Sequence, residues 1–240
     1  MKLSTNTIQV LKNFASINQN LVIKEGNTIS TMSAMKNIVA KAEVEETFPK
    51  QVAIYDLNEF LASLSLFKNP ILTFEDSFLN ITEENGRKTV KYFYSDPSVV
   101  TTPTKEISMP SNEVTFTLTD ADISEISKAA GVLSAPDLVL EKEGGDVRLT
   151  VKDKKNDTAN SCQIDIDVKN DGTFKFFFKT ENLKLLPGKY EVEVSSKNIS
   201  HLKTEKRNIG LHLNQNQLIL RRSVIYGKIS LGGETPSNEG

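Results

Sequence analysis

Carboxylates are the side chains with the clearest potential for chemistry in this 240-residue sequence. They occur in three groups: Glu43, Glu45 and Glu46; Asp120 and Asp122; and Asp165 and Asp167. Neighbouring carboxylates serve in acid–base catalysis or bind a divalent cation. Each group also fits a structural role: a strand end, a helix first turn where the dipole favours acids, and the solvent face of an alternating strand. We favour these structural roles. A magnesium-dependent nuclease using Asp165 and Asp167 is the less favoured alternative.

Other residues of catalytic sites are scarce. His201 and His212 lack a metal-ligand spacing, and the single cysteine, Cys162, excludes the usual zinc sites. The sequence contains no glycine-rich phosphate-binding motif and no G-x-S-x-G nucleophile motif. The sequence therefore predicts a protein that is not an enzyme and that has no metal or cofactor.

The composition is that of an ordinary folded protein, with 38% hydrophobic and 25% charged residues. The formal net charge of −2 gives no overall basic field, although a basic face can coexist with an acidic exterior. One cysteine fits a reducing cytoplasm. No apolar run approaches the roughly 18 residues that a membrane helix needs, so we expect no membrane partner.

The first half of the chain is expected to alternate helices with strands. Residues 4–19 have apolar side chains at helical spacing and contain no acidic residue. A short apolar strand at Val52–Tyr55 leads directly into a helix that Asp56 caps, with Glu59 three residues later. This helix is expected to end before Pro70. Three strands then follow over 71–94, with Asn85-Gly86 as a hairpin turn.

The second half repeats this order after a linker over 96–112, which contains three prolines. A strand at 113–118 meets a helix with a Thr119 and Asp122 capping box. Strands follow, and a strand over 173–179 runs into a short helix capped by Thr180 that extends through Leu186, before Pro187. The sequence thus predicts an α+β protein built from two similar halves.

Four segments carry a resemblance to a known family. They are MKLS with LKNFASIN at the start, VAIYDLNEFL (52–61), YSDPSVV (94–100) and LPGKYEVEV (186–194). In this order they resemble the sliding clamps of T-even-type bacteriophages, which are relatives of proliferating cell nuclear antigen. The resemblance implies the DNA-clamp fold, in which two similar domains each pack two helices on antiparallel sheet and the chains close into a ring. It places the domains at 1–102 and 113–230, with a linker at 103–112 and a disordered tail at 231–240.

The same resemblance implies a function. The expected protein is a homotrimer that encircles duplex DNA without sequence preference and tethers the replicative DNA polymerase, raising its processivity. It requires an ATP-dependent clamp loader, because the sequence has no nucleotide-binding motif of its own. It acts in the cytoplasm of the infected bacterial host. The alternative is a non-enzymatic, oligomeric structural or scaffold protein of a virion.

Two sets of site residues follow from the resemblance. Helix faces with sparse lysines and small polar side chains are expected to face DNA; they comprise Lys12, Asn13, Ser16, Lys68, Lys128 and Lys184. A pocket for partner peptides is expected beneath the linker, formed by Val99, Val100, Ile107, Pro187 and Leu211. Residues 217–229 extend beyond the family pattern and either add a strand, cover the pocket or extend an interface.

Overall fold

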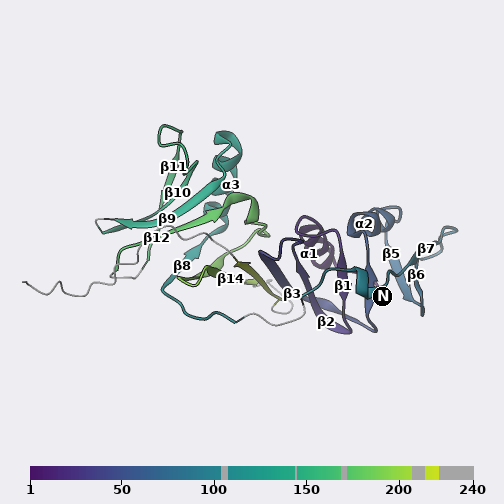
Figure 1. Ribbon diagram of the computed structural model, residues 1–240. Helices are drawn as coiled ribbons and strands as arrows, with labels where there is room; N and C mark the ends of the chain where they lie inside the picture. Colours follow the sequence, from purple (N-terminus) through teal and green to yellow (C-terminus); the bar gives the residue numbers. More distant parts are fainter. Residues whose placement is uncertain (104–107, 144, 169–171, 207–213, 222–240) are drawn as a thin grey trace, which may run out of the picture. The chain divides into compact units, whose positions relative to one another are not determined.

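The computed structural model describes residues 1–103, 108–143, 145–168, 172–206 and 214–221 (Figure 1). The chain forms two compact units. Unit 1 comprises Met1–Ser108, Lys184–Gly188 and Lys203–Arg221, and unit 2 comprises Met109–Leu183, Lys189–Leu202 and Arg222–Gly240. The domain limits expected from the sequence, at 102 and 113, remain predictions.

Unit 1 begins with α1 (Thr5–Ala15), which is capped from two sides. The Ser4 hydroxyl accepts a hydrogen bond from the Thr7 backbone N–H at 3.1 Å. The first turn of α1 contains no acidic residue. Glu46, from strand β3, accepts hydrogen bonds from the Ser4 N–H and the Thr7 hydroxyl instead. A carboxylate from the sheet therefore complements the positive end of the α1 dipole.

The larger sheet of unit 1 has the strand order β4-β1-β2-β3-β15. Its strands are β1 (Leu21–Ile23), β2 (Gly26–Met32), β3 (Ile38–Phe48), β4 (Val52–Ile54) and β15 (Asn214–Arg221). All four pairings are antiparallel, and β15 lies against β3 with Leu218 opposite Ala40. Of the three possibilities for the C-terminal extension, its first part adds a strand.

The strand-to-helix junction at Asp56 is confirmed. Asp56 Oδ1 accepts hydrogen bonds from the N–H groups of Asn58 and Glu59, at 2.9 and 3.2 Å. Helix α2 (Leu57–Ser65) follows and buries Leu57, Phe60 and Leu64. The second sheet of unit 1 has the order β5-β6-β7. Its strands are β5 (Pro70–Phe74), β6 (Phe78–Glu83) and β7 (Val90–Phe93).

A short 3-10 helix, η1 (Pro97–Val99), is the next element of unit 1. Unit 2 then repeats the passage from a strand into a helix. Strand β8 (Val114–Leu118) leads into α3 (Asp120–Leu133), and the predicted capping box between Thr119 and Asp122 is present. Four strands in the order β11-β10-β9-β12 form a sheet of their own; β13 pairs antiparallel with β8, and β14 is the next neighbour of β13. These strands are β9 (Asp137–Glu143), β10 (Asp146–Lys152), β11 (Cys162–Asp165), β12 (Phe174–Lys179), β13 (Tyr190–Ser195) and β14 (Ile199–Lys206).

The predicted helix over 180–186 is wrong. The chain forms only a 3-10 helix, η2 (Thr180–Asn182), and its cap position has no side-chain hydrogen bond. The Thr180 hydroxyl donates to the carbonyl of Ala135, 45 residues away, at 3.1 Å. Thr180 lies inside η2, and Lys179 occupies the N-cap position instead. Among the described residues, unit 1 has two α-helices and unit 2 has one, with η2 in the place of its second helix.

The repeat itself is confirmed. Unit 1 runs α1, four strands, α2 and three strands, and unit 2 runs α3, four strands, η2 and further strands. In both units a strand passes into a helical turn within two residues, at Asp56 and at Thr180. The fold is α+β, with helices packed on antiparallel sheet.

Candidate nucleic-acid interface

Among the elements predicted to face DNA, helix α1 has a basic residue and no acidic residue. Lys12 is the only charged residue of α1; it is exposed and lies in the last turn, where the helix dipole favours a cation. Ser16, the C-cap residue, is also exposed. This face can attract a phosphate through one ammonium group and offers no carboxylate to oppose it.

Asn13 and Lys184 are brought together, although 171 residues separate them. The Asn13 side-chain amide donates to the Lys184 carbonyl at 3.0 Å. Both residues belong to unit 1, because Lys184–Gly188 returns to it. Lys184 is not on a helix, contrary to the expectation, since the helix predicted around it does not form. Asn13 thus joins α1 to the returning segment.

Lys68 also lies outside a helix. Helix α2 ends at Ser65, and Lys68 occupies an exposed bend beyond it. The helix itself carries Glu59 in its first turn and no lysine. Any attraction of phosphate to this region therefore comes from the segment after α2.

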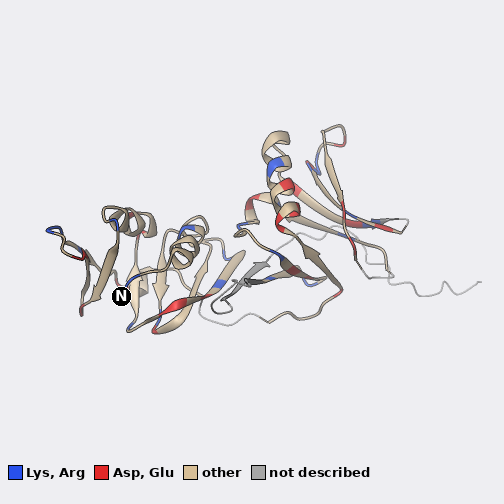
Figure 2. Cartoon of the chain, turned by 180° about the vertical axis from the view of Figure 1, so that it is seen from behind, with Lys and Arg blue, Asp and Glu red and all other residues tan. Residues whose placement is uncertain are grey.

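Helix α3 carries more acidic than basic residues. Asp120, Asp122 and Glu125 precede the single lysine, Lys128, which is exposed. Figure 2 shows acidic residues in the first turns of α3 and basic colour farther along it. Asp122 is committed to the cap, accepting hydrogen bonds from the Thr119 N–H and hydroxyl at 2.7 Å. Attraction of phosphate is thus confined to the C-terminal half of α3. The sequence had already indicated Asp120 and Asp122 in the first turn of this helix, but the set of DNA-facing residues was chosen from the basic and small polar residues without weighing these acids against Lys128.

The predicted partner-peptide pocket is described in part. Val100 is 6% exposed and packs with Val22 and Ala53, so it belongs to the core of unit 1. Val99 and Pro187 are both exposed. Ile107 and Leu211 lie outside the described residues.

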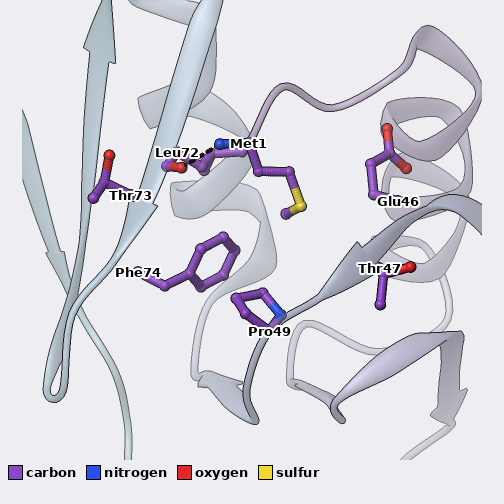
Figure 3. Close-up of a pocket in the computed structure, with 7 residues that line it drawn as sticks. All are labelled: Met1, Glu46, Thr47, Pro49, Leu72, Thr73 and Phe74. Carbon is purple, nitrogen blue, oxygen red and sulfur yellow. Dashed lines mark hydrogen bonds between the residues drawn. The ribbon is translucent and has the colours of Figure 1, made fainter.

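A hollow of about 530 Å³ opens elsewhere in unit 1 (Figure 3). Met1 forms its rim by pairing with β5: the Met1 amine donates to the Leu72 carbonyl at 2.7 Å, and the Leu72 N–H donates to the Met1 carbonyl at 2.8 Å. The hollow is lined by Met1, Glu46, Thr47, Pro49, Leu72, Thr73 and Phe74. Its one carboxylate, Glu46, already caps α1. The hollow therefore offers surface for packing and no arrangement for acid–base chemistry.

The nuclease alternative gains no support from Asp165. The Arg148 Nε group donates to Asp165 Oδ1 at 3.2 Å across the β10–β11 pair. Over the described part of the chain, no three His, Cys, Asp or Glu side chains are grouped so that they could hold a metal ion.

None of the helices described here is both long enough and apolar enough to cross a bilayer.

The surroundings of Tyr92 and of Glu113 shift the pKa values of these two groups. Burial, with Glu59 and Asp56 nearby, raises the pKa of Tyr92 to about 12. The Tyr92 ring packs on Phe60 with centroids 5.2 Å apart, which explains the burial. The Glu113 pKa is affected most by burial, which raises it, but hydrogen bonds from the side chain and backbone of Ser196 and from Ser111 together hold it below its ordinary value. Both groups stabilise the fold and neither lies in an open catalytic site.

Comparison with solved structures places this architecture among the DNA clamps. Proliferating Cellular Nuclear Antigen from Entamoeba histolytica superposes with a TM-score of 0.65 at 14% identity, covering 90% of this chain and 94% of that one. A. fulgidus PCNA, solved with the C-terminal region of FEN-1 bound, gives a TM-score of 0.68 at 13% identity, with coverages of 92% and 96%. The repeated helix-on-sheet units and these likenesses define a clamp fold of the PCNA class.

Sequence comparison identifies the family. A family model described as DNA polymerase processivity factor matches residues 2–102. The chain is 33% identical over 206 residues to the sliding clamp of Vibrio phage KVP40, covering 83% of this chain and 93% of the relative. It is 29% identical over 196 residues to the sliding clamp of Enterobacteria phage T4, with coverages of 80% and 86%. The chain belongs to the sliding clamp family of T4-like phages, the DNA polymerase processivity factors. The virion-scaffold alternative is not favoured.

Proposed function

We propose that three copies of this chain close into a ring around duplex DNA and tether the replicative polymerase to it. The protein itself catalyses no reaction; a separate ATP-dependent loader opens and closes the ring, and all of this takes place in the cytoplasm of an infected bacterium. The proposal of a ring rests on two edge strands, one in each unit. Basic residues lie at one of these edges and acidic residues at the other.

The two edge strands are β7 and β11. Each lies at one edge of its sheet: β7 in the order β5-β6-β7 and β11 in the order β11-β10-β9-β12. An edge strand presents unpaired backbone groups that can pair with a second chain. Because the two edges differ, pairing β7 of one copy with β11 of the next is heterologous, and such pairing closes into a ring when the rotation allows.

The charges near these edges are complementary. Arg87, Lys88 and Lys91 lie on or just before β7, and all three are exposed. Asp165 and Asp167 lie on or just after β11 and are also exposed. Opposite potentials on the two edges favour the head-to-tail pairing over pairing of an edge with its own copy.

Contacts with DNA are sparse in this proposal. Lys12 and Lys128 supply mobile ammonium groups that neutralise phosphates without reading sequence. The polymerase is held through a short peptide at the surface beside Val100, where Val99 and Pro187 are exposed. The structure of A. fulgidus PCNA with the C-terminal region of FEN-1 bound is a precedent for peptide binding in this fold.

Sedimentation of edge variants tests the ring. We expect a trimer mass for the native chain and monomers for Lys91→Glu or Asp167→Lys alone, because each places like charges across the interface. The combined variant is expected to recover the trimer, and Lys24→Glu, an exposed lysine in unit 1, serves as the control. A monomeric native chain at micromolar concentration, or no recovery in the combined variant, would contradict the proposed interface.

Primer extension tests the function. With cognate polymerase, loader and ATP, the native chain is expected to lengthen the products on primed DNA, whereas the monomeric variants should not. Equal product lengths with and without the native chain would refute the tethering function.

A further inference from the structure

A cluster of lysines surrounds a hollow of about 380 Å³ in unit 2, and the helices that we propose to face DNA contribute nothing to it. Its lining comprises Lys152, Lys154, Lys155, Asp157, Lys175 and Phe177. Four lysines and one aspartate give it a net charge of +3 at neutral pH. From this hollow we infer a docking site for a short acidic segment of a partner protein.

The hollow is built by a loop that folds back over the sheet. Strands β10 and β12 are separated by β9, so their lysines lie on two strands about 10 Å apart. The backbone N–H of Lys154 donates to Asp137 Oδ2 at 3.3 Å, which ties the loop after β10 to β9. Asp137 is 1% exposed and also holds Lys179 at 2.7 Å. A buried carboxylate therefore fixes the lysine-bearing loop in place.

The floor of the hollow is aromatic. Two ammonium groups lie over the same ring: Lys154 Nζ is 5.0 Å and Lys175 Nζ 6.0 Å from the centroid of Phe177. Such contacts hold cations against an apolar surface. Phe177 is 8% exposed, and Glu141 offsets one of the two charges through a salt bridge to Lys175. The other lysines of the lining concentrate positive potential above this buried ring, an arrangement that suits an anionic ligand.

The surroundings favour an acidic peptide over nucleic acid. Strand register places Glu141, Arg148 and Asp165 in one row with Lys175, on the same face of the sheet. This row therefore brings carboxylates beside the lysines. A DNA duplex carries a charge every ~1.7 Å and needs a long basic stripe. It would meet Glu141 and Asp165, whereas a few consecutive acidic residues fit within the hollow.

The volume agrees with a short ligand. At about 380 Å³ the hollow is near the lower end of the ~300–1,000 Å³ range of binding pockets. Lysine recognises carboxylates as a point charge, so the site selects for a local density of acidic side chains. It does not select for one particular sequence.

Fluorescence anisotropy with the full-length protein tests this site. The probe is a labelled peptide with about four consecutive Asp and Glu residues, measured at low ionic strength, where exposed charges are weakly screened. The comparison peptide has Asn and Gln in their place. Lys154→Glu/Lys155→Glu is expected to weaken binding of the acidic peptide at least ~tenfold through two charge reversals. Lys189→Glu/Lys197→Glu is the matched control, since both lysines are exposed in unit 2 and the net charge changes equally.

The outcomes separate the alternatives. Selective loss in Lys154→Glu/Lys155→Glu, with an unchanged urea midpoint, supports the site; Lys155→Glu alone should give a smaller loss in the same direction if the double variant unfolds. Equal weakening in both double variants, or no preference for the acidic peptide over the amide peptide, overturns it. A duplex oligonucleotide that loses affinity in Lys154→Glu/Lys155→Glu while the peptide does not would also overturn it, in favour of a nucleic-acid contact.

Discussion

Replacing Glu46 by alanine should destabilise the clamp through helix α1, which carries Lys12. Glu46 accepts hydrogen bonds from the backbone N–H of Ser4 and from the hydroxyl of Thr7, which is fully buried. A hydrogen bond to a charged group contributes about 1.5–3 kcal/mol, and a carboxylate at a helix N-terminus about 0.3–1 kcal/mol. The Ser4 hydroxyl also donates to Thr7 Oγ1 at 3.0 Å, so Thr7 retains one hydrogen bond after the change. We expect a net loss of about 2 kcal/mol.

Thermal unfolding measures this loss. For a chain of this size, about 2 kcal/mol corresponds to a fall in Tm of roughly 4–8 °C. Variants must be compared at equal protomer concentration, because an oligomer gains apparent stability by mass action. Glu45→Ala is the control: its carboxylate is exposed one residue earlier on β3, and a change within about 0.5 kcal/mol is expected. If Glu46→Ala is no less stable than Glu45→Ala, then the sheet carboxylate does not support α1 and the reasoning fails.

Three further predictions concern ionisation and DNA. The Tyr92 pKa is raised to about 12, so stability is fully present below pH 10 and falls as pH rises toward 12; in Tyr92→Phe this alkaline loss should be smaller by urea midpoint. The Glu113 pKa is lowered, so its stabilisation is present above its unfolded value and is lost as pH falls through the folded value; Glu113→Gln should lose less stability on acidification than the native chain. Lys12→Glu/Lys128→Glu should reduce loading onto DNA and lower the salt dependence of loading, with Lys24→Glu unchanged; equal salt slopes in a loading assay would contradict the assigned DNA face.

Local capping signals were predictable from the sequence, because the groups that satisfy one another lie within a few residues. Asp56 binds N–H groups two and three residues ahead, and Thr119 and Asp122 complete each other's hydrogen bonds. The hairpin at Asn85 was predictable for the same reason: the residue adopts φ 58°, which asparagine tolerates well. Local chemistry at these points decides where an element begins or turns.

Features that depend on distant partners were not predictable. In place of the helix expected at Thr180, the structure ties this residue to a distant segment: its hydroxyl donates to the Ala135 carbonyl and its backbone N–H to the Pro136 carbonyl. Glu46 has a strand-end position in the sequence, yet it accepts a hydrogen bond from Ser4, the N-cap residue of α1, 42 residues earlier. Lys184 was assigned to the DNA-facing residues because a helix was expected around it. The structure has no helix there, and the Lys184 carbonyl accepts a hydrogen bond from Asn13. In each case tertiary contacts override a reasonable local pattern.

The charge distribution explains how a chain with net charge −2 can serve as a clamp. Helix α3 uses Asp120 and Asp122 to stabilise its own N-terminus, which leaves Lys128 as its one attractive group. In helix α1 no acidic residue of the helix itself opposes the lysine. The carboxylate at its N-terminus belongs to Glu46 of β3, and Lys12 is the only charged residue of the helix. Strong binding would require many lysines, and each phosphate neutralised would also resist movement along the duplex. A ring that retains DNA by enclosing it needs only weak attraction, so acidic helix starts with isolated lysines are compatible with retention and with sliding.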